Sequence, residues 1–193
     1  MGKVVFDTSM SLDGFMAASN VSPEEPMGQD GERLHDWALG SDPVGTEVLA
    51  RGVGSIGAVI CGRRTYDLSL PWWGADGPTG AARLPVIVVS HSGDDAAPEG
   101  GVYAFVDGIE GALARAREAA GDKDVTVMGG ASIGQQYLRA GLVDELSIHL
   151  VPVLLGDGIR MFEGLGPRHV DLQTVEVLEG SDATHLRFRV AGR

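Results

Sequence analysis

Short runs rich in valine and isoleucine recur along the chain, and those in its middle are continuously apolar rather than alternating. Continuous runs of about four to eight apolar residues are typical of strands that are covered on both faces. The last two runs alternate apolar and polar positions more clearly, as the strands of an antiparallel hairpin do. The runs expected as strands are 3–11, 57–62, 84–90, 101–106, 124–130, 144–156, 170–179 and 184–190.

Helical patterns lie between these runs, at 42–53, 108–121 and 131–141. In the second of them, Leu113 and Ala116 lie on one apolar face, with charged residues opposite. Strands that alternate with helices predict an α/β layer fold. We expect a mostly parallel sheet with an antiparallel edge formed by the C-terminal strands.

The organisation predicted from this pattern is one domain covering residues 1–193, because the length fits a single domain and no internal repeat is visible. Glycine and proline concentrate in two stretches, 14–41 and 71–83. Both are expected to be long loops, and loops of this length in a compact domain commonly serve as lids or binding loops.

Composition narrows the classes of partner. The 193 residues carry a formal net charge of −12, so the chain has no general attraction to nucleic acid or to an anionic membrane. No apolar run approaches the roughly 18 residues of a membrane-spanning helix, and a cytoplasmic protein is expected. The single cysteine, Cys61, excludes an internal disulfide and is expected as a buried thiol, while the five histidines lack metal-ligand spacing, so no metal is predicted.

The first chemical signal is the segment VICGRRTYD, in which two arginines follow the end of an apolar strand. Gly62 allows a turn and a close approach of a ligand to the backbone. Thr65 can cap a new helix, and Arg63 and Arg64 offer planar donors that match phosphate oxygens. A phosphate monoester held by arginines distinguishes NADP from NAD, although two solvated surface arginines remain the alternative interpretation.

The second signal is VTVMGGASIG, which reads as a strand, a glycine pair and a helix. Gly129 and Gly130 have no Cβ, so their backbone can lie against a flat ring or a diphosphate. Ala131, Ser132 and Ile133 begin a helix whose amides can bind an anion. The spacing G-G-x-x-x-G differs from the dinucleotide fingerprint G-x-G-x-x-G, and a simple tight turn is the alternative.

With these segments in hand, SLDGFMA, VICGRRTYD, VIVVS, VTVMGGASIGQQYLRAGLVDELSIHLVPVLLGDGIRMF and HLRFRV occur in an order that resembles the dihydrofolate reductase-like family. The chain is most similar to the branch that contains the C-terminal reductase domain of the riboflavin-biosynthesis protein RibD. The resemblance covers nearly the whole chain. It implies a three-layer α/β/α sandwich, NADPH as the cofactor and a homodimer.

The resemblance also implies roles for individual residues. Arg63, Arg64 and Thr65 match the family's segment for the adenosine 2′-phosphate and the diphosphate. Ser90 matches the next strand end on the adenosine side. The range 129–133 matches the loop under the diphosphate and the nicotinamide.

Two departures from the family pattern qualify this resemblance. Fused RibD proteins carry a zinc deaminase half, which needs H-x-E and P-C-x-x-C ligands, and neither motif occurs in this sequence. Folate reductases carry a tryptophan-bearing lid, which the glycine- and proline-rich stretch 14–41 replaces here. The similarity is therefore to the reductase half alone.

A reductase needs a proton source beside the hydride acceptor. Asp13, in SLDGF, occupies a position that faces the substrate pocket in the resembled branch, and an Asp-Gly turn is the alternative. Glu47 lies early in the helix expected at 42–53, near the pteridine-binding carboxylate of folate reductases, or it is an ordinary first-turn acid. Asp36 is a third candidate, and Trp37 either stacks on the substrate ring or packs in the core.

The function expected from the sequence is an NADPH-dependent reductase that acts on a C=N or C=O bond of a small heterocyclic substrate. Its nearest named activity is the reduction of 5-amino-6-(5-phosphoribosylamino)uracil in riboflavin biosynthesis. Two alternatives stay open: a dihydrofolate or pteridine reductase, and a nucleotide-binding protein without catalysis.

Overall fold

A computed structural model describes residues 2–91, 97–167 and 169–191 of the chain. Across these described residues, eight strands form one sheet in the order β5-β4-β3-β6-β1-β7-β10-β9. These strands are β1 (Val4–Ser11), β3 (Ile56–Gly62), β4 (Val86–Val89), β5 (Tyr103–Val106), β6 (Asp124–Met128), β7 (Glu145–Val151), β9 (Leu172–Glu179) and β10 (Thr184–Val190).

The first six strands of this order run parallel to one another. β10 then pairs antiparallel with β7, and β9 pairs antiparallel with β10. The mostly parallel sheet with an antiparallel C-terminal edge is therefore confirmed. A separate two-stranded sheet joins β2 (Phe15–Ala18) to β8 (Gly158–Arg160).

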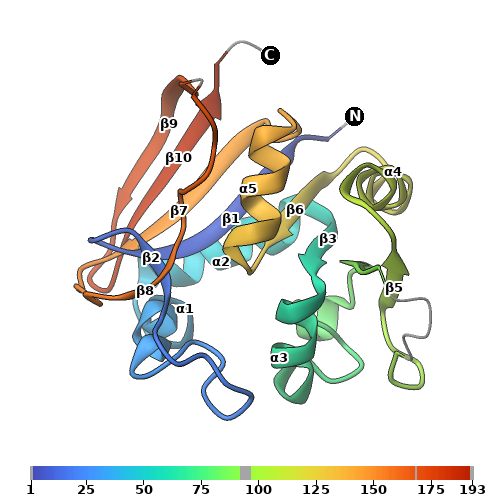
Figure 1. Cartoon of the computed structure of the whole chain (residues 1–193), viewed down its shortest axis with the longest axis horizontal. Coiled ribbons are helices and arrows are strands. Elements are labelled where there is room, and N and C mark those ends of the chain that lie inside the picture. Colours follow the sequence, from blue (N-terminus) through green and yellow to red (C-terminus); the bar gives the residue numbers. More distant parts are fainter. Residues whose placement is uncertain (1, 92–96, 168, 192–193) are drawn as a thin grey trace.

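Helices cover both faces of the large sheet and give the molecule three layers (Figure 1). In the view of Figure 1, α4 and α5 lie in front of the sheet and α2 lies behind it. The helical segments are η1 (Gly31–His35), α1 (Asp36–Leu39), α2 (Pro43–Ser55), α3 (Arg63–Trp73), η2 (Gly80–Ala82), α4 (Ile109–Ala120) and α5 (Ala131–Arg139).

Each face of the sheet has its own core. On one face, Phe6 and Ile60 pack in a cluster with Leu113 of α4 and Tyr137 of α5. On the other face, a second cluster joins strands β3 and β4 to Tyr66 of α3. The apolar runs thus lie in strands that are covered twice, as their lack of alternation indicated.

Both stretches expected as loops contain regular structure. The stretch 14–41 contains β2, η1 and α1, and the stretch 71–83 begins inside α3 and also contains η2. Pro71, the first residue of the second stretch, lies in the last turn of α3, which continues to Trp73. The expectation of plain loops was therefore wrong for these residues.

Gly134 of α5 packs directly against Phe6 of β1. A Cβ atom built on it would lie 2.0 Å from Cζ of Phe6, so no side chain fits there without a shift of the helix. We predict that Gly134→Ala lowers the free energy of unfolding by about 1–3 kcal/mol through overpacking, as measured by urea denaturation.

The matched control is Gly52→Ala in α2, where the added Cβ would have no neighbour within 4 Å. An alanine in an exposed helix interior is expected to raise stability by about 0.5–1 kcal/mol. Equal midpoints for the two variants would contradict this account of the α5 contact.

Candidate active site

The carboxyl ends of three neighbouring strands meet at one edge of the sheet. β3 lies between β4 and β6, and all three run parallel. Their ends lead to Gly62 and α3, to Ser90, and to the pair Gly129 and Gly130. In open α/β sheets ligands bind outside the carboxyl ends of the strands, so this edge is the candidate site.

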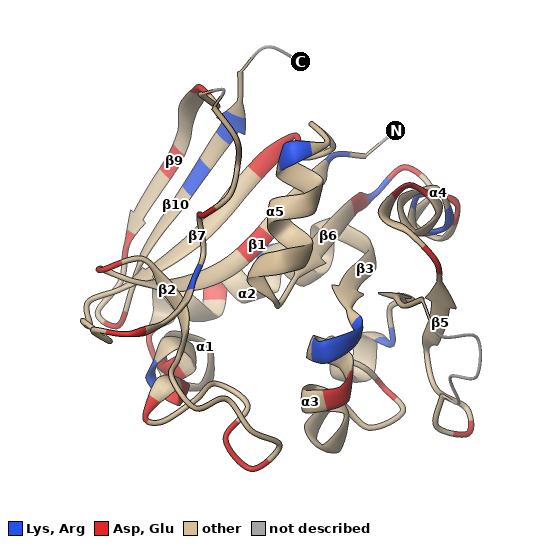
Figure 2. Ribbon diagram, in the orientation of Figure 1, with Lys and Arg blue, Asp and Glu red and all other residues tan. Residues whose placement is uncertain are grey.

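Arg63 is the first residue of α3 and is held in a defined orientation. Its Nε donates to Oδ1 of Asp67 at 2.8 Å, one helical turn later, and its Nη1 donates to Oγ of Ser90 at 3.3 Å. The guanidinium carbon also lies 5.9 Å from the ring centroid of Phe105. Arg64, its neighbour, is exposed, and both belong to the basic segment at the start of α3 in Figure 2.

Thr65 does not cap α3, because the helix begins two residues earlier and Gly62 is its N-cap. The expected cap was wrong. Thr65 instead lies against the glycine pair of the neighbouring turn: a Cβ on Gly129 would be 2.4 Å from Cγ2 of Thr65, and one on Gly130 would be 3.0 Å from its Oγ1. Both glycines also have positive φ, +63° and +57°, which side chains rarely adopt.

The same turn leads into α5, whose N-cap is Gly130. Ala131 and Ile133 are buried, whereas Ser132 is exposed beside them. A Cβ on Gly62 would lie 3.7 Å from Cβ of Ile133, so the turns after β3 and β6 are in contact. The structure therefore brings together the residues predicted to bind the cofactor.

Cys61 lies just before this site and takes no part in it. The residue is buried, and burial raises the pKa of its thiol to about 12. It remains a protonated, inert thiol, in agreement with the expectation of a buried cysteine.

Asp13 lies in the turn between β1 and β2. Its carboxylate accepts hydrogen bonds from Ser11 Oγ at 2.6 Å, from the Leu155 amide at 3.1 Å and from the Gly156 amide at 2.7 Å. The bond from Ser11, followed by that from Gly156, lowers the pKa of the Asp13 carboxyl to about 2. Asp13 is thus ionised at neutral pH and ties two loops together; it has no proton of its own to donate.

Glu47 lies on α2 and is exposed over 67% of its side chain. It faces Arg51, whose guanidinium Nε is 3.7 Å away and which also pairs with Glu176 of β9. This surface cluster does not include any of the residues at the ends of β3, β4 and β6. The structure gives no geometric support for Glu47 as a proton donor at that edge.

Trp37 is a core residue with 5% of its surface exposed. Its Nε1 donates to Oγ of Ser9 at 2.9 Å, and its ring centroid lies 4.0 Å from that of His149 and 4.9 Å from that of His185. These contacts match the packing alternative for Trp37 rather than stacking on a ligand. His149 is itself buried, and its Nδ1 lies 2.8 Å from Nδ1 of His185.

Asp7 is a candidate that the sequence interpretation missed. It lies on β1, and its Oδ2 is 3.4 Å from Nε2 of His149, whose Nδ1 is 2.8 Å from Nδ1 of His185. The available signal was the polar spacing in DTSMS, because polar residues at alternate positions of a strand share one face. The joint position of the two histidines depends on strand register, which the sequence did not reveal.

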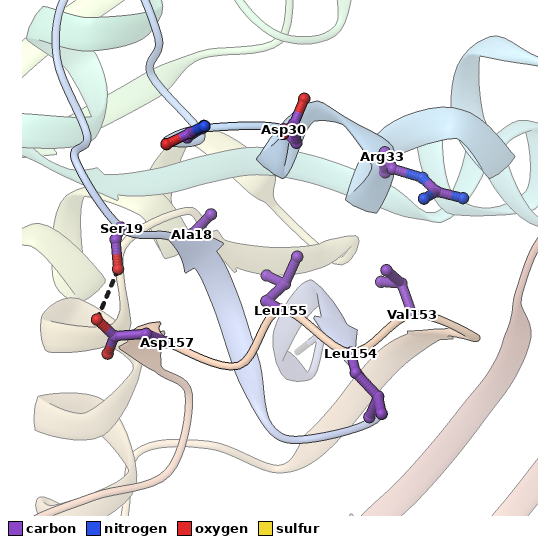
Figure 3. Close-up of a pocket in the computed structure, with 9 residues that line it drawn as sticks. Ala18, Ser19, Asp30, Arg33, Val153, Leu154, Leu155 and Asp157 are labelled. Carbon is purple, nitrogen blue, oxygen red and sulfur yellow. Dashed lines mark hydrogen bonds between the residues drawn. The ribbon is translucent and has the colours of Figure 1, made fainter.

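A pocket of about 320 Å³ lies between the end of β2, η1 and the loop after β7 (Figure 3). On one side of it, Ser19 Oγ donates to Oδ2 of Asp157 at 2.8 Å, and this bond lowers the pKa of the Asp157 carboxyl. The residues that line the pocket are Ala18, Ser19, Gln29, Asp30, Arg33, Val153, Leu154, Leu155 and Asp157. The stretch 14–41 thus contributes a wall to a pocket, as a binding segment would.

The RibD C-terminal domain family model matches residues 2–186. The chain belongs to the RibD C-terminal domain family. A curated relative, the uncharacterized protein YyaP of Bacillus subtilis (strain 168), is 26% identical over 171 residues, which cover 83% of this chain and 80% of YyaP.

Solved structures of a riboflavin-biosynthesis protein and of a dihydrofolate reductase have the same fold as this chain. A protein of Shewanella sp. PV-4 with a provisional riboflavin-biosynthesis name has a TM-score of 0.70 and 23% identity, and each chain covers 100% of the other. Dihydrofolate reductase of Enterococcus faecalis, complexed with NADP(H) and RAB-propyl, has a TM-score of 0.64 and 14% identity, with 99% of this chain and 98% of that chain covered. The expected dihydrofolate reductase-like fold and RibD branch are confirmed.

Metal-binding clusters and membrane-spanning helices are two further features that bear on the function of this RibD C-terminal domain. Within residues 2–91, 97–167 and 169–191, no three His, Cys, Asp or Glu side chains group so that they could hold a metal ion. Among the same described residues, none of the helices has the length and apolar character needed to cross a membrane.

The Asp13 carboxylate links the β1–β2 turn to the loop after β7, and this link, the Asp13 clasp, can be tested by amide hydrogen exchange. In Asp13→Ala, the amides of Leu155 and Gly156 lose their acceptor, and we predict faster exchange there by at least tenfold, with α5 unchanged. Glu24→Ala is the control, because it removes an exposed carboxylate from the segment between β2 and η1 without touching those amides. Unchanged protection at Leu155 and Gly156 would refute the clasp.

Proposed function

We propose that this chain is an NADPH-dependent reductase of a small heterocyclic substrate, with 5-amino-6-(5-phosphoribosylamino)uracil reduction in riboflavin biosynthesis as its nearest named activity. The observation that carries the proposal is the meeting of Arg63, Ser90 and the glycine pair 129–130 at one sheet edge. Membership of the RibD C-terminal domain family supports the same conclusion. The expected cytoplasmic location stays a prediction.

The donor set at this edge fits a phosphorylated dinucleotide. Arg63 and Ser90 place a guanidinium and a hydroxyl side by side, which suits a phosphate monoester such as the adenosine 2′-phosphate. The start of α5 and the backbone of Gly129 and Gly130 would hold the diphosphate, because helix N-terminal amides and side-chain-free backbone favour anions. NADPH bound there would supply the hydride.

Other residues of the chain would then hold the cofactor-binding groups and one wall of the pocket in fixed positions. Asp67 holds Nε of Arg63, so the remaining guanidinium edge is aimed at Ser90. Thr65 packs against the glycine pair and sets the distance between the two turns. Asp13 holds the β1–β2 turn against the loop after β7 and thereby shapes one wall of the pocket in Figure 3.

A nucleotide-binding protein without catalysis is the second candidate. The observation in its favour is that neither expected acid is suited to donate a proton, since Asp13 has a pKa of about 2 and Glu47 lies on the surface of α2. Titration with NADPH followed by turnover assays distinguishes the two candidates. Oxidation of NADPH in the presence of the aminouracil supports the riboflavin-pathway reductase, and oxidation in the presence of dihydrofolate supports a folate reductase. Binding of NADPH without oxidation by either substrate supports the second candidate.

We also propose that the protein is a homodimer, as the resemblance implies. β9 is an edge strand, so one row of its backbone groups has no neighbouring strand in the sheet. Val175 and Val177 expose 45% and 55% of their surface on this strand. An open edge with exposed apolar side chains is typical of an association surface.

The cofactor proposal predicts a selective loss. Arg63→Ala removes a charge-assisted contact worth about 1.5–3 kcal/mol, so NADPH affinity should fall about 10- to 100-fold while NADH affinity changes little. Isothermal titration with both cofactors measures this difference. Arg64→Ala should have a smaller effect, and Arg115→Ala on α4, an exposed arginine paired with Glu118, is the control. Equal losses for NADPH and NADH would refute the role in binding the 2′-phosphate.

The dimer proposal predicts that Val177→Glu shifts the protein to monomer. The charge would be buried against the partner chain without a counter-ion, which a dimer interface tolerates poorly. Light scattering after size-exclusion chromatography measures the mass. Ala114→Glu on α4, an exposed alanine on a helix that packs on β3 and β4 near the opposite edge of the sheet, is the control. A monomeric wild-type protein, or a Val177→Glu dimer, would overturn the proposal.

A further inference from the structure

One stretch of the sheet face lies between two covered regions. On this face, α3 packs over β3 and β4, η1 and α1 pack over the far end of β1 and over β7, and α2 runs behind the sheet. Asp7 lies between them, in the middle of β1, with 38% of its side chain exposed. Burial is nevertheless the largest single influence on the pKa of its carboxyl.

The carboxylate is held from one side. His149 Nε2 lies 3.4 Å from its Oδ2, and Ser147, its register partner on β7, also lowers the pKa of the carboxyl. Burial raises the pKa of Asp7, but the nearby His149, Ser147 and Arg187 outweigh it, and the net shift is downward. Asp7 is therefore an ionised acceptor at neutral pH.

The two histidine rings are joined through their Nδ1 atoms, which lie 2.8 Å apart. If His149 donates from Nε2 to Asp7, its Nδ1 is an acceptor, and Nδ1 of His185 must be the donor across the 2.8 Å contact. Nε2 of His185 is then an unprotonated nitrogen, and it is a buried atom without a hydrogen-bond partner in the described part of the chain. In that arrangement His185 orients His149, and His149 in turn orients the Asp7 carboxylate.

Register places this carboxylate beside the proposed cofactor loop. Asp7 pairs with Met128 of β6, and Met128 directly precedes Gly129. Paired residues of neighbouring strands lie about 5 Å apart, so Asp7 is one strand away from the turn that would hold the nicotinamide end of the cofactor. A substrate placed to accept hydride there would lie over this part of the sheet.

We propose that Asp7 is a substrate-binding carboxylate, which accepts hydrogen bonds from adjacent N–H groups of a heterocycle, with His149 and His185 as its positioning residues. This inference rests on the proposed reductase function. It defines the substrate class as a ring with neighbouring N–H donors, because an ionised carboxylate attracts such an edge and repels one that presents carbonyl oxygens.

If Asp7 had only a structural role, its carboxylate would be expected to be buried and paired with cations of the protein. Glu145, on the neighbouring strand β7 and the same sheet face, shows that arrangement: it is 1% exposed and bonded to both Lys3 Nζ and Arg187 Nε at 2.7 and 2.6 Å. Asp7, by contrast, keeps 38% of its side chain exposed. Glu145 is therefore a matched control carboxylate.

The test compares two small probes that share a ring, 2,4-diaminopyrimidine and uracil. Isothermal titration with and without NADPH should show that the wild-type protein prefers the diamine. Asp7→Asn should lose this preference by at least tenfold, because an amide offers a donor as well as an acceptor, whereas Glu145→Gln should retain it. The readout is a ratio of affinities, so a general loss of stability does not imitate it.

A second measurement needs no variant. A carboxylate contact favours the protonated diamine, so the absorption spectrum of the probe bound to wild-type protein should be that of the cation at a pH where the free probe is neutral. A neutral bound spectrum, no binding of the diamine, or an unchanged preference in Asp7→Asn would overturn the proposal. The probes bind without turnover, so these outcomes are independent of whether NADPH binds or is oxidised.

Turnover gives the third readout where a substrate is found. Asp7→Asn should raise KM more than it lowers kcat, and His149→Gln, which can still donate a hydrogen bond, should give a smaller effect of the same kind. A fall in kcat with KM unchanged would assign Asp7 to the chemical step instead and overturn the binding role.

Discussion

Thr65 packs directly against the backbone of Gly129 and Gly130, and this contact determines how two strand-to-helix turns meet. The glycines have positive φ and no room for a Cβ, so the β6 turn can approach α3 closely only with this sequence. β3 and β6 are neighbours in a parallel sheet, so their carboxyl ends lie side by side. The contact between Thr65 and the glycine pair holds the turns that follow these two strands side by side as well. Arg63 and Ser90 then lie at a fixed distance from the start of α5.

The acidic balance of the chain makes this local geometry decisive. A net charge of −12 opposes any anion at long range, but such forces are screened beyond about 8 Å at physiological salt. Binding of a phosphate therefore depends on donors within contact distance. Arg63 meets that requirement because Asp67 and Ser90 fix its guanidinium before any ligand arrives, which lowers the entropy lost on binding.

Features that one short segment determines were predicted from the sequence, whereas features that depend on how distant segments pair were not. The turns at GRRTY and GGASIG were predicted because glycine, arginine and the end of an apolar run lie within a few residues of one another. The edge hairpin was predicted from alternation alone. Asp7 and His185 were missed because their proximity arises through His149 from the register of β1, β7 and β10, and no segment of sequence contains that information. Glu47 was overvalued because the number of residues before α2 fixes the position of a carboxylate only when the intervening path is known.

The two carboxylates near the first strand illustrate what decides whether an acid can meet a ligand. An ionised carboxylate has roughly four acceptor positions. Asp13 uses three of them on Ser11 and on two backbone amides, and the loops that it joins would separate if a ligand took their place. The carboxylate of Asp7 lies against His149, with Ser147 as a second influence on its pKa, and 38% of the Asp7 side chain stays exposed. The same functional group, six residues apart, therefore serves as a clasp in one position and is left able to accept from a ligand in the other.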